Sequence, residues 1–186
     1  MKRLFDIVCS VVLLVILLIP MILIAISVKT SSKGGVLYWS DRMGRDNVTF
    51  KMPKFRSMII NTPAMATHLL KDPKGVLTPI GNFLRKYSLD EFPQLWNILK
   101  GDMSFVGPRP ALFNQDDLIS LRSAHGVDKI LPGLTGWAQI NGRDGLLIAE
   151  KVKMDVEYLK RRSFFFDLKI LWLTLLDVVK KEGVSH

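Results

Sequence analysis

The stretch Lys86–Pro110, KYSLDEFPQLWNILKGDMSFVGPRP, combines a helical pattern with a pair of adjacent carboxylates, Asp90 and Glu91. SLDE matches a capping box with Ser88 as the N-cap, but Pro93 then falls past the first turn of the helix. A helix that starts at Asp90 instead places Pro93 within the first turn, where proline is tolerated. Either register puts the acidic pair at a helix N-terminus, where free backbone N–H groups and the helix dipole favour negative charge.

The adjacent carboxylates fit two roles. Acidic side chains in a first helical turn stabilise the helix, which is a structural role. They could also share catalytic work, because neighbouring residues of a helix point in different directions. One carboxylate could then attack an electrophile while the other handles a proton or a metal ion. The motif alone leaves both roles open.

Composition favours one domain with a membrane element. A chain of 186 residues can form one domain with a core, and 48% hydrophobic residues with a mean hydropathy of +0.22 indicate membrane contact. The single cysteine, Cys9, excludes a disulfide framework and a cysteine-rich metal site. The net charge of +9 suits nucleic acid, anionic lipid headgroups or phosphorylated small molecules, and composition does not rank them.

An uncharged apolar run, IVCSVVLLVILLIPMILIAISV, covers Ile7–Val28 and is long enough for a membrane segment. Pro20 removes a helical hydrogen bond inside this run and clashes with the preceding turn, so we expect a break near Ile19. Basic residues flank both ends: Lys2 and Arg3 before the run, Lys29 and Lys33 after it. Basic flanks prefer the cytoplasmic face. A re-entrant hairpin over residues 1–29 keeps the two basic flanks on that face and accommodates the break at the proline. The alternative is an ordinary signal anchor, since spanning helices tolerate proline.

The rest of the chain, residues 30–186, mixes strand and helix patterns after a short TSSKGG linker. Val36–Phe55 has the composition of a β-hairpin with a turn at GRDN. Helical patterns follow at Thr62–Lys71, Phe92–Leu99, Ala111–Ser123 and Leu147–Arg162. The last apolar segment, Phe164–Lys181, could lie at the membrane interface or pack on the core. We predict a mixed α and β fold that is mainly helical.

Two loops, GDMSFVGPRP and PGLTGWAQINGR, concentrate glycine, proline and arginine, as loops do when they turn sharply or approach a ligand closely. Arg109 lies between two prolines that restrict its backbone and limit the order it must gain on binding an anion. It is therefore a candidate for a bidentate phosphate contact. Further positive charge could come from Lys54, Arg56, Arg85 and Arg143.

Taken together, four segments resemble the monotopic phosphoglycosyl transferases, the bacterial sugar transferases that move a phospho-sugar onto polyprenol phosphate. These segments are FDIV before the proline-broken run, KFRSM, SLDEFPQLWNILKGDMSFVGPRP and PGLTGWAQINGR. The resemblance covers about Lys2 to Gly183. The chain is similar to the small catalytic form of the family, because no block of extra membrane helices precedes the matching region. One departure is Ile19-Pro20, where relatives often carry Ser-Pro. The hydroxyl that could bond to the broken helix backbone is therefore missing here.

The resemblance implies a re-entrant helix, interfacial amphipathic helices and a catalytic domain on the cytoplasmic face of the bacterial inner membrane. It implies that Asp90 attacks the sugar-bearing phosphate of a UDP-sugar and expels UMP, with Glu91 as the second catalytic residue. Mg²⁺ is the expected cofactor, with Asp90 as its ligand. Polyprenol (undecaprenyl) phosphate is the expected acceptor. Four residues match phosphate or nucleotide contacts and basic positions near the site: Arg109, Arg143, Arg85 and Lys54.

A second class of function is a membrane-anchored basic protein that binds a partner without catalysis. The sequence carries no RNA-recognition signature, so we expect no nucleic-acid partner. It also lacks a Walker loop, a dinucleotide glycine fingerprint and a histidine-rich zinc motif. Release of UMP from a UDP-sugar would distinguish the enzyme from the binding protein.

Overall fold

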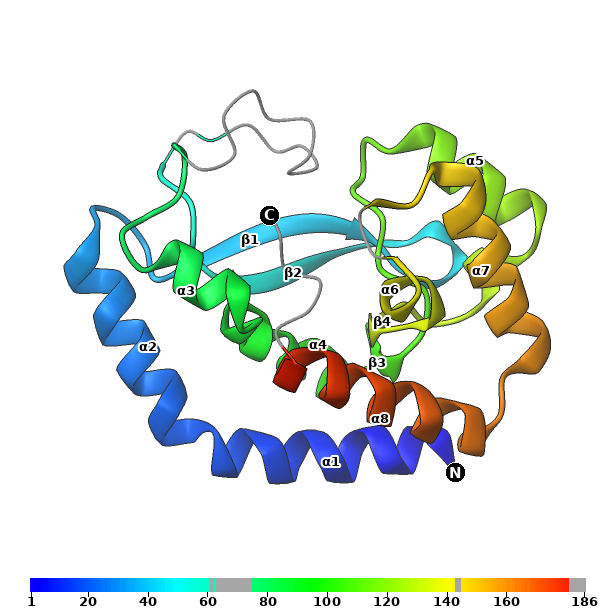
Figure 1. Ribbon diagram of the computed structural model, residues 1–186, viewed down its shortest axis with the longest axis horizontal. Helices are drawn as coiled ribbons and strands as arrows, with labels where there is room; N and C mark the ends of the chain where they lie inside the picture. The colour runs from blue at the N-terminus through cyan, green and yellow to red at the C-terminus, as the bar shows by residue number, and fades with distance from the viewer. Residues whose placement is uncertain (61, 63–74, 143–144, 181–186) are drawn as a thin grey trace.

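The computed structural model describes residues 1–60, 62, 75–142 and 145–180, and it is mainly helical with two small sheets. Helix α1 (Lys2–Ile16) runs along one edge of the molecule, and α2 (Leu18–Ser31) turns away from it (Figure 1). A hairpin of β1 (Leu37–Met43) and β2 (Thr49–Phe55) crosses the middle. The predicted mixed fold is confirmed.

The N-terminal apolar segment is a bent pair of helices. Its break falls at Leu17, between α1 and α2, rather than near Ile19 as the sequence predicted. Pro20 is the third residue of α2, where it cannot donate to the carbonyl of Ile16, so the helix breaks one turn before the proline. Among the described residues no single helix is long and apolar enough to cross a membrane, and only α1 and α2 together, bent by 62°, meet that length and composition.

The N-terminal end of this helix pair is fastened to the rest of the fold by polar side chains. Lys2 Nζ donates to Asp167 Oδ2 at 2.6 Å and to the carbonyl of Val106 at 2.8 Å. Arg3 donates to the last carbonyls of α4 (Leu95–Lys100), those of Ile98 and Leu99. These bonds satisfy carbonyls that a helix C-terminus leaves unpaired.

The other end of the pair is held by Arg56, which follows β2. Its guanidinium donates to the carbonyls of Ser32 and Lys33, at 2.9 and 2.5 Å, and to the hydroxyl of Ser32 at 2.8 Å. Arg56, one of the cations that the sequence offered for phosphate binding, is therefore engaged at the C-terminus of α2. Both ends of the bent pair are fixed to the same folded body.

The predicted hairpin is confirmed, with Leu37 opposite Phe55 and Met43 opposite Thr49. Its turn contains a short 3-10 helix, η1 (Arg45–Asn47), in which Asp46 and Asn47 have φ of 57°. This left-handed conformation suits Asp and Asn, whose short polar side chains tolerate it.

The two glycine-rich loops form the second sheet, in which β3 (Ser104–Val106) pairs in parallel with β4 (Gly133–Thr135). Glycine is required here because the backbones approach closely. A Cβ on Gly133 would lie 2.1 Å from the amide nitrogen of Gly107, and a Cβ on Gly136 would lie 2.1 Å from the carbonyl oxygen of Gly107. These glycines bring the two loops against each other.

The remaining helices are α3 (Gly81–Lys86), α5 (Asp116–Ala124), α6 (Trp137–Ile140), α7 (Ile148–Arg161) and α8 (Phe164–Lys180), with the short 3-10 helices η3 (Leu89–Gln94) and η4 (Val127–Lys129). The predicted helix at Leu147–Arg162 is confirmed as α7. The one at Phe92–Leu99 is divided between η3 and α4. The one at Ala111–Ser123 begins only at Asp116, and the one at Thr62–Lys71 lies outside the described residues but for Thr62.

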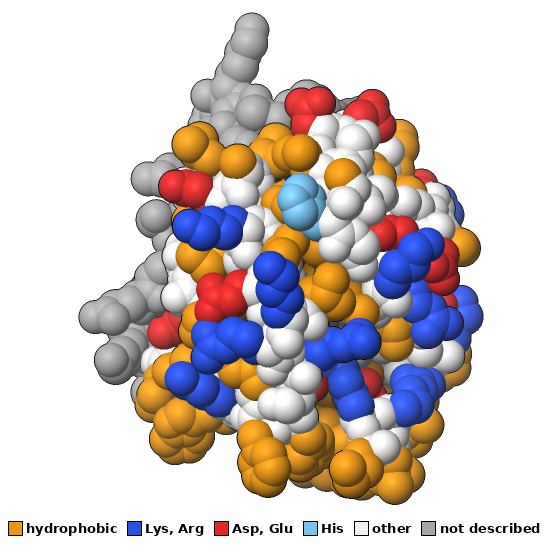
Figure 2. All heavy atoms as spheres, turned by 90° about the vertical axis from the view of Figure 1, so that its right-hand side faces the viewer, with side chains coloured by type: hydrophobic (Ala, Val, Ile, Leu, Met, Phe, Trp, Pro, Cys, Tyr) orange, Lys and Arg blue, Asp and Glu red, His pale blue; other side chains and the backbone are white. Residues whose placement is uncertain are grey.

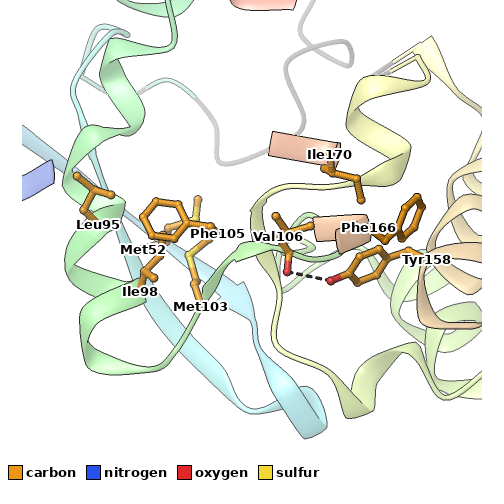
Figure 3. Close-up of a cluster of buried hydrophobic side chains, with 9 residues drawn as sticks. All are labelled: Met52, Leu95, Ile98, Met103, Phe105, Val106, Tyr158, Phe166 and Ile170. Carbon is orange, nitrogen blue, oxygen red and sulfur yellow. Dashed lines mark hydrogen bonds between the residues drawn. The ribbon is translucent and has the colours of Figure 1, made fainter. Parts of the chain in front are cut away.

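The main core joins α4, β2, β3, α7 and α8 through nine buried side chains (Figure 3): Met52, Leu95, Ile98, Met103, Phe105, Val106, Tyr158, Phe166 and Ile170. The hydroxyl of Tyr158 donates to the carbonyl of Val106, so the one polar group of the cluster is paired. Helix α8 therefore packs on the core, which was one of its two predicted positions.

Helices α1, α2 and α8 also carry apolar side chains that face outward. Figure 2 shows hydrophobic side chains along the lower edge of the molecule, with Lys and Arg gathered above them. On α8, Phe165 is 82% exposed and Trp172 is 62% exposed. On α1 and α2 the most exposed are Leu4, Val15, Ile16, Ile19 and Leu23. Contiguous apolar surface of this kind marks a site of interaction with another molecule or a membrane.

Candidate active site

The acidic pair lies in the first turn of η3, which is a 3-10 helix with Pro93 inside it. The capping box is not formed: Ser88 has a left-handed backbone, with φ of 55°, and makes no side-chain cap bond. An N-cap residue normally has an extended backbone. Glu91 instead turns its carboxylate toward cations from other segments, so the pair belongs to a polar site and not to a helix cap.

Two cations hold Glu91. Lys54 Nζ on β2 donates to Glu91 Oε1 at 2.6 Å, and Arg109 Nη2 donates to the same oxygen at 2.8 Å. Burial by itself raises the pKa of Glu91, but the charges and hydrogen bonds of Arg109 and Lys54 outweigh it and hold that pKa well below its usual range. Glu91 is therefore ionised at neutral pH.

Asp90 has the opposite environment. It is 7% exposed, and burial raises its pKa above the ordinary value. The cations Lys54, Arg85 and Arg109 act in the other direction, and the neighbouring Glu91 charge adds to the rise. Adjacent titratable groups whose environments push their pKa values apart are typical of groups with different tasks. A buried carboxylate with a raised pKa is also a better nucleophile once it is ionised.

A cleft of about 990 Å³ brings these residues together. The polar part of its lining includes Lys54, Arg85, Asp90, Glu91 and Arg109, together with Arg56 and further polar side chains. Of the predicted site residues, the structure therefore gathers five around one space. Arg143 lies outside the described residues. The strands and loops that carry these side chains are distant in sequence, and η3 packs against β2 to unite them.

The cleft continues over an apolar part, which includes Phe5, Cys9 and Leu13 of α1, Leu17 at the break, and Leu171, Leu175 and Val178 of α8. On each helix the spacing of these residues places them on one face. The two helices run side by side in Figure 1, and the rings of Phe5 and Phe164 meet edge to face with 5.6 Å between their centroids. The sequence contained no signal for this pairing, because α1 ends at Ile16 and α8 begins only at Phe164.

Asp90 is the residue that could hold a metal ion. Within the described part of the chain, no group of three or more His, Cys, Asp or Glu side chains could form a complete metal site. Mg²⁺ commonly takes one or two carboxylates, several waters and the phosphate oxygens of a substrate. Asp90 lines the cleft beside cations suited to phosphate, so the donor set fits a magnesium ion that a bound diphosphate would complete.

Sequence reasoning missed two arginines that contact the loop of Arg109. Arg42 Nη1 donates to the carbonyl of Pro110 at 3.1 Å, and Arg122 Nη1 donates to the carbonyl of Arg109 at 2.7 Å. Both line the cleft. Neither lies in a motif of its own, and their contacts become visible only when the chain is folded.

The cleft thus places the buried carboxylate of Asp90 and the paired carboxylate of Glu91 beside several cations and next to an apolar region. Residues 1–181 match the family described as bacterial sugar transferase, and the chain belongs to that family. The family predicted from the sequence motifs is confirmed.

Similar proteins cover this chain almost completely. A Bacillus subtilis sugar transferase, itself uncharacterised, is 40% identical over 186 residues, 100% of this chain and 91% of that protein. The UDP-glucose:undecaprenyl-phosphate glucose-1-phosphate transferase of Escherichia coli is 40% identical over 184 residues, 94% of this chain and 39% of that protein. The undecaprenyl-phosphate galactose phosphotransferase of Salmonella typhimurium is 37% identical over 203 residues, 98% of this chain and 41% of that protein. This chain thus spans about two fifths of the two enzymes named by their reaction.

Proposed function

We propose that this protein is a phosphoglycosyl transferase that moves a phospho-sugar from a UDP-sugar to undecaprenyl phosphate, as a first membrane step of surface glycan assembly. The observation that carries the proposal is the cleft itself. It joins a buried carboxylate and three cations to an apolar groove between α1 and α8. The names of the Escherichia coli and Salmonella typhimurium relatives point to the same acceptor, and that of the Escherichia coli enzyme also points to a UDP-sugar donor.

In the first step, a carboxylate oxygen of Asp90 attacks the phosphorus that bears the sugar. The bond from this phosphorus to the bridging oxygen of the diphosphate breaks, and that oxygen leaves with its electron pair as part of UMP. The phospho-sugar is now an acyl phosphate on Asp90. Ionised Asp90 is required for this step, and its burial removes the water that would otherwise stabilise the carboxylate against reaction.

In the second step, a phosphate oxygen of undecaprenyl phosphate attacks the same phosphorus. The acyl phosphate bond breaks, Asp90 leaves as a carboxylate, and the product is a lipid diphosphate that carries the sugar. Two successive displacements replace one encounter of donor, acceptor and enzyme in a single transition state.

The cations of the polar part stabilise the charge that develops on the phosphates. Arg109 is 39% exposed as a side chain, so its guanidinium can face a ligand while it bonds Glu91. Glu91 orients Arg109 and Lys54, and its low pKa keeps both contacts in place. Asp90 would hold Mg²⁺ together with diphosphate oxygens, and the bound ion would neutralise part of the diphosphate charge.

The apolar part of the cleft suits the isoprenoid chain of the acceptor. Its side chains come from two helices that also expose apolar surface to the outside of the molecule. A lipid could therefore bring its phosphate to Asp90 while its chain stays in contact with hydrocarbon. Each buried methylene of such a chain contributes about 0.8 kcal/mol.

The fold also supports a re-entrant helix pair on the cytoplasmic face of the bacterial inner membrane. A spanning segment would separate its two ends by the thickness of the bilayer, which is about 30 Å of hydrocarbon. Lys2, Arg3 and Arg56 instead bind both ends to the same domain. Pro20 and the 62° bend allow the chain to enter and leave on one side.

Cysteine labelling tests this topology. In a Cys9→Ser background, a cysteine inserted after Met1 and a Lys33→Cys variant should both react with an impermeant maleimide applied from the cytoplasmic side of sealed vesicles. Asp117→Cys, on the exposed surface of α5, is the control for that side. Labelling of the two test positions from opposite sides would contradict the re-entrant arrangement.

The catalytic proposal is tested by UMP release. Purified protein in nanodiscs with undecaprenyl phosphate and Mg²⁺ is given a panel that includes UDP-glucose and UDP-galactose, and UMP is measured. We expect release with at least one UDP-sugar, together with a sugar diphosphate lipid in equal amount. A chain that binds UDP-sugars and the lipid but releases no UMP under any of these conditions would favour the non-catalytic binding protein.

A further inference from the structure

The Pro108-Arg109-Pro110 segment is fixed through three consecutive carbonyl groups. The amide of Gly133 donates to the carbonyl of Pro108 at 2.9 Å, Arg122 to that of Arg109 at 2.7 Å, and Arg42 to that of Pro110 at 3.1 Å. Proline has no N–H, so at positions 108 and 110 the carbonyl is the only backbone hydrogen-bonding group. The donors come from β4, α5 and β1, which surround the segment.

The side chain of Arg122 is only 11% exposed. Its Nε and Nη2 donate to Asp155 Oδ2 at 2.9 and 2.7 Å, while its Nη1 reaches the Arg109 carbonyl. Asp155 lies on α7 and is 1% exposed. The planar guanidinium fork therefore joins α7 to the backbone of the loop, a link that the point charge of lysine could not reproduce.

We infer that Arg122 and Asp155 are positioning residues for Arg109. A chain of hydrogen bonds runs from Asp155 through Arg122 to the Arg109 carbonyl, and from the Arg109 guanidinium to Glu91 Oε1. The inference rests on the proposed function, in which Arg109 binds the donor phosphates. When the Arg109 carbonyl is held, the backbone from which the Arg109 guanidinium reaches Glu91 is fixed.

Two other roles are open to the same residues. Arg122 lines the cleft, so it could bind a phosphate directly. Three of its nitrogens, however, already donate to protein atoms in the bonds named above. The pair could also stabilise only the packing of α5 on α7, where Leu118 and Val152 form a small buried cluster with Ala111. The three roles differ in whether the effect of Arg122 requires Arg109.

A double-mutant cycle distinguishes them. The test variant combines Arg122→Gln with Asp155→Asn, because removal of one partner alone would leave a buried group unpaired. We expect kcat/KM for UDP-sugar to fall about 100-fold, the effect of a misplacement near 1 Å. In an Arg109→Ala background the same pair of changes should cause less than about a threefold further loss, since the positioned group is gone. Direct phosphate binding by Arg122 or general destabilisation predicts losses that multiply across the two backgrounds. Such losses would overturn the inference.

Val152→Ala is the matched control, because it loosens the packing of α5 on α7 without touching Arg122. We expect it to lower stability but to leave kcat/KM within about threefold of wild type. Hydrogen exchange supplies a readout independent of turnover. The amide hydrogens of Arg109 and Ala111 should exchange about tenfold faster in the test variant than in Val152→Ala.

The two proposals can fail separately. If the wild-type protein turns over no UDP-sugar, the proposed function fails, and the exchange measurement alone decides the positioning. Equal exchange rates at Arg109 in the test variant and in Val152→Ala would then overturn it. If the wild type is active and the cycle is additive, the positioning fails while the proposed function stands.

Discussion

The polar and apolar parts of the cleft are built in different ways. The polar part depends on short hydrogen bonds between charged groups, such as Lys54 and Arg109 on Glu91, and it has a fixed geometry. The apolar part includes side chains such as Leu13, Leu171 and Leu175, whose van der Waals contacts are not directional. The polar part therefore fixes the positions of its ligand groups, whereas the adjoining apolar part accepts a chain in more than one position. This difference predicts that changes in the polar part alter chemistry with any acceptor, whereas changes in the apolar part alter only the use of the lipid.

The largest effect is expected for Asp90→Asn. Loss of the nucleophile should lower transfer by about 10⁴-fold or more. Because burial raises the pKa of Asp90 in the folded state, its ionised form destabilises the fold as pH rises, and that cost is present at neutral pH. The neutral amide removes the cost, so Tm should rise by about 3 °C.

Asp116→Asn, at the exposed start of α5, is the control: it should leave transfer unchanged and lower Tm slightly, because a first-turn carboxylate stabilises its helix. Calorimetry measures Tm, and a transfer assay on the same samples measures activity. An inactive Asp90→Asn protein with a lower Tm would mean that the carboxylate supports the fold, and the contrast between the two parts of the cleft would lose its catalytic basis.

A smaller effect is expected for Arg109. Arg109→Ala should lower kcat/KM by about 10²- to 10³-fold, the range seen when one donor to a developing charge is removed. Arg109→Lys keeps the charge but loses the planar fork, so it should resemble Arg109→Ala more than wild type. Both variants should act equally on long-chain and short-chain acceptors. Near-normal turnover by Arg109→Lys would show that the polar part needs only charge, and that it is as permissive as the apolar part.

The smallest effect is expected in the apolar part. Leu171→Ala should raise KM for undecaprenyl phosphate about tenfold, because burial of a leucine side chain contributes about 1.5–3 kcal/mol. The KM for a short acceptor such as farnesyl phosphate, and for the UDP-sugar, should stay constant. Leu168→Ala is the matched control, since Leu168 lies on the same helix and does not line the cleft. Equal KM changes for long and short acceptors would show that this surface does not hold the lipid chain.

The same contrast explains what could be predicted from the sequence. Asp90, Glu91 and Arg109 fall within one contiguous block, so a motif could identify them before any contact was known. Their opposite pKa shifts could not be predicted, because these depend on Lys54 reaching Glu91 from a strand 37 positions earlier in the chain. The sequence predicted the break of the N-terminal helix near Ile19, two residues after its observed position at Leu17. The break lies earlier because Pro20 has no N–H to donate to the carbonyl four residues before it.

The apolar part left no local signal. Its two faces come from opposite ends of the chain, and the spacing of Phe5, Cys9 and Leu13 is the same as that of any buried helix face. The pairing of Lys2 with Asp167 fixes α1 beside α8, whereas the sequence indicated Lys2 only as a basic flank of the apolar run. The division into a membrane segment at residues 1–29 and a catalytic domain at 30–186 stays a prediction.

The covalent role of Asp90 is tested most directly by isotope exchange without acceptor. Protein is incubated with a UDP-sugar, Mg²⁺ and labelled UMP in nanodiscs that contain no undecaprenyl phosphate, and label in the UDP-sugar is measured. We predict exchange by wild type, because UMP attacks the acyl phosphate in reverse, and none by Asp90→Asn. Full transfer with lipid present, but neither exchange without it nor a phospho-sugar adduct on Asp90 after rapid quench, would contradict the two-step account and favour direct attack by the lipid phosphate.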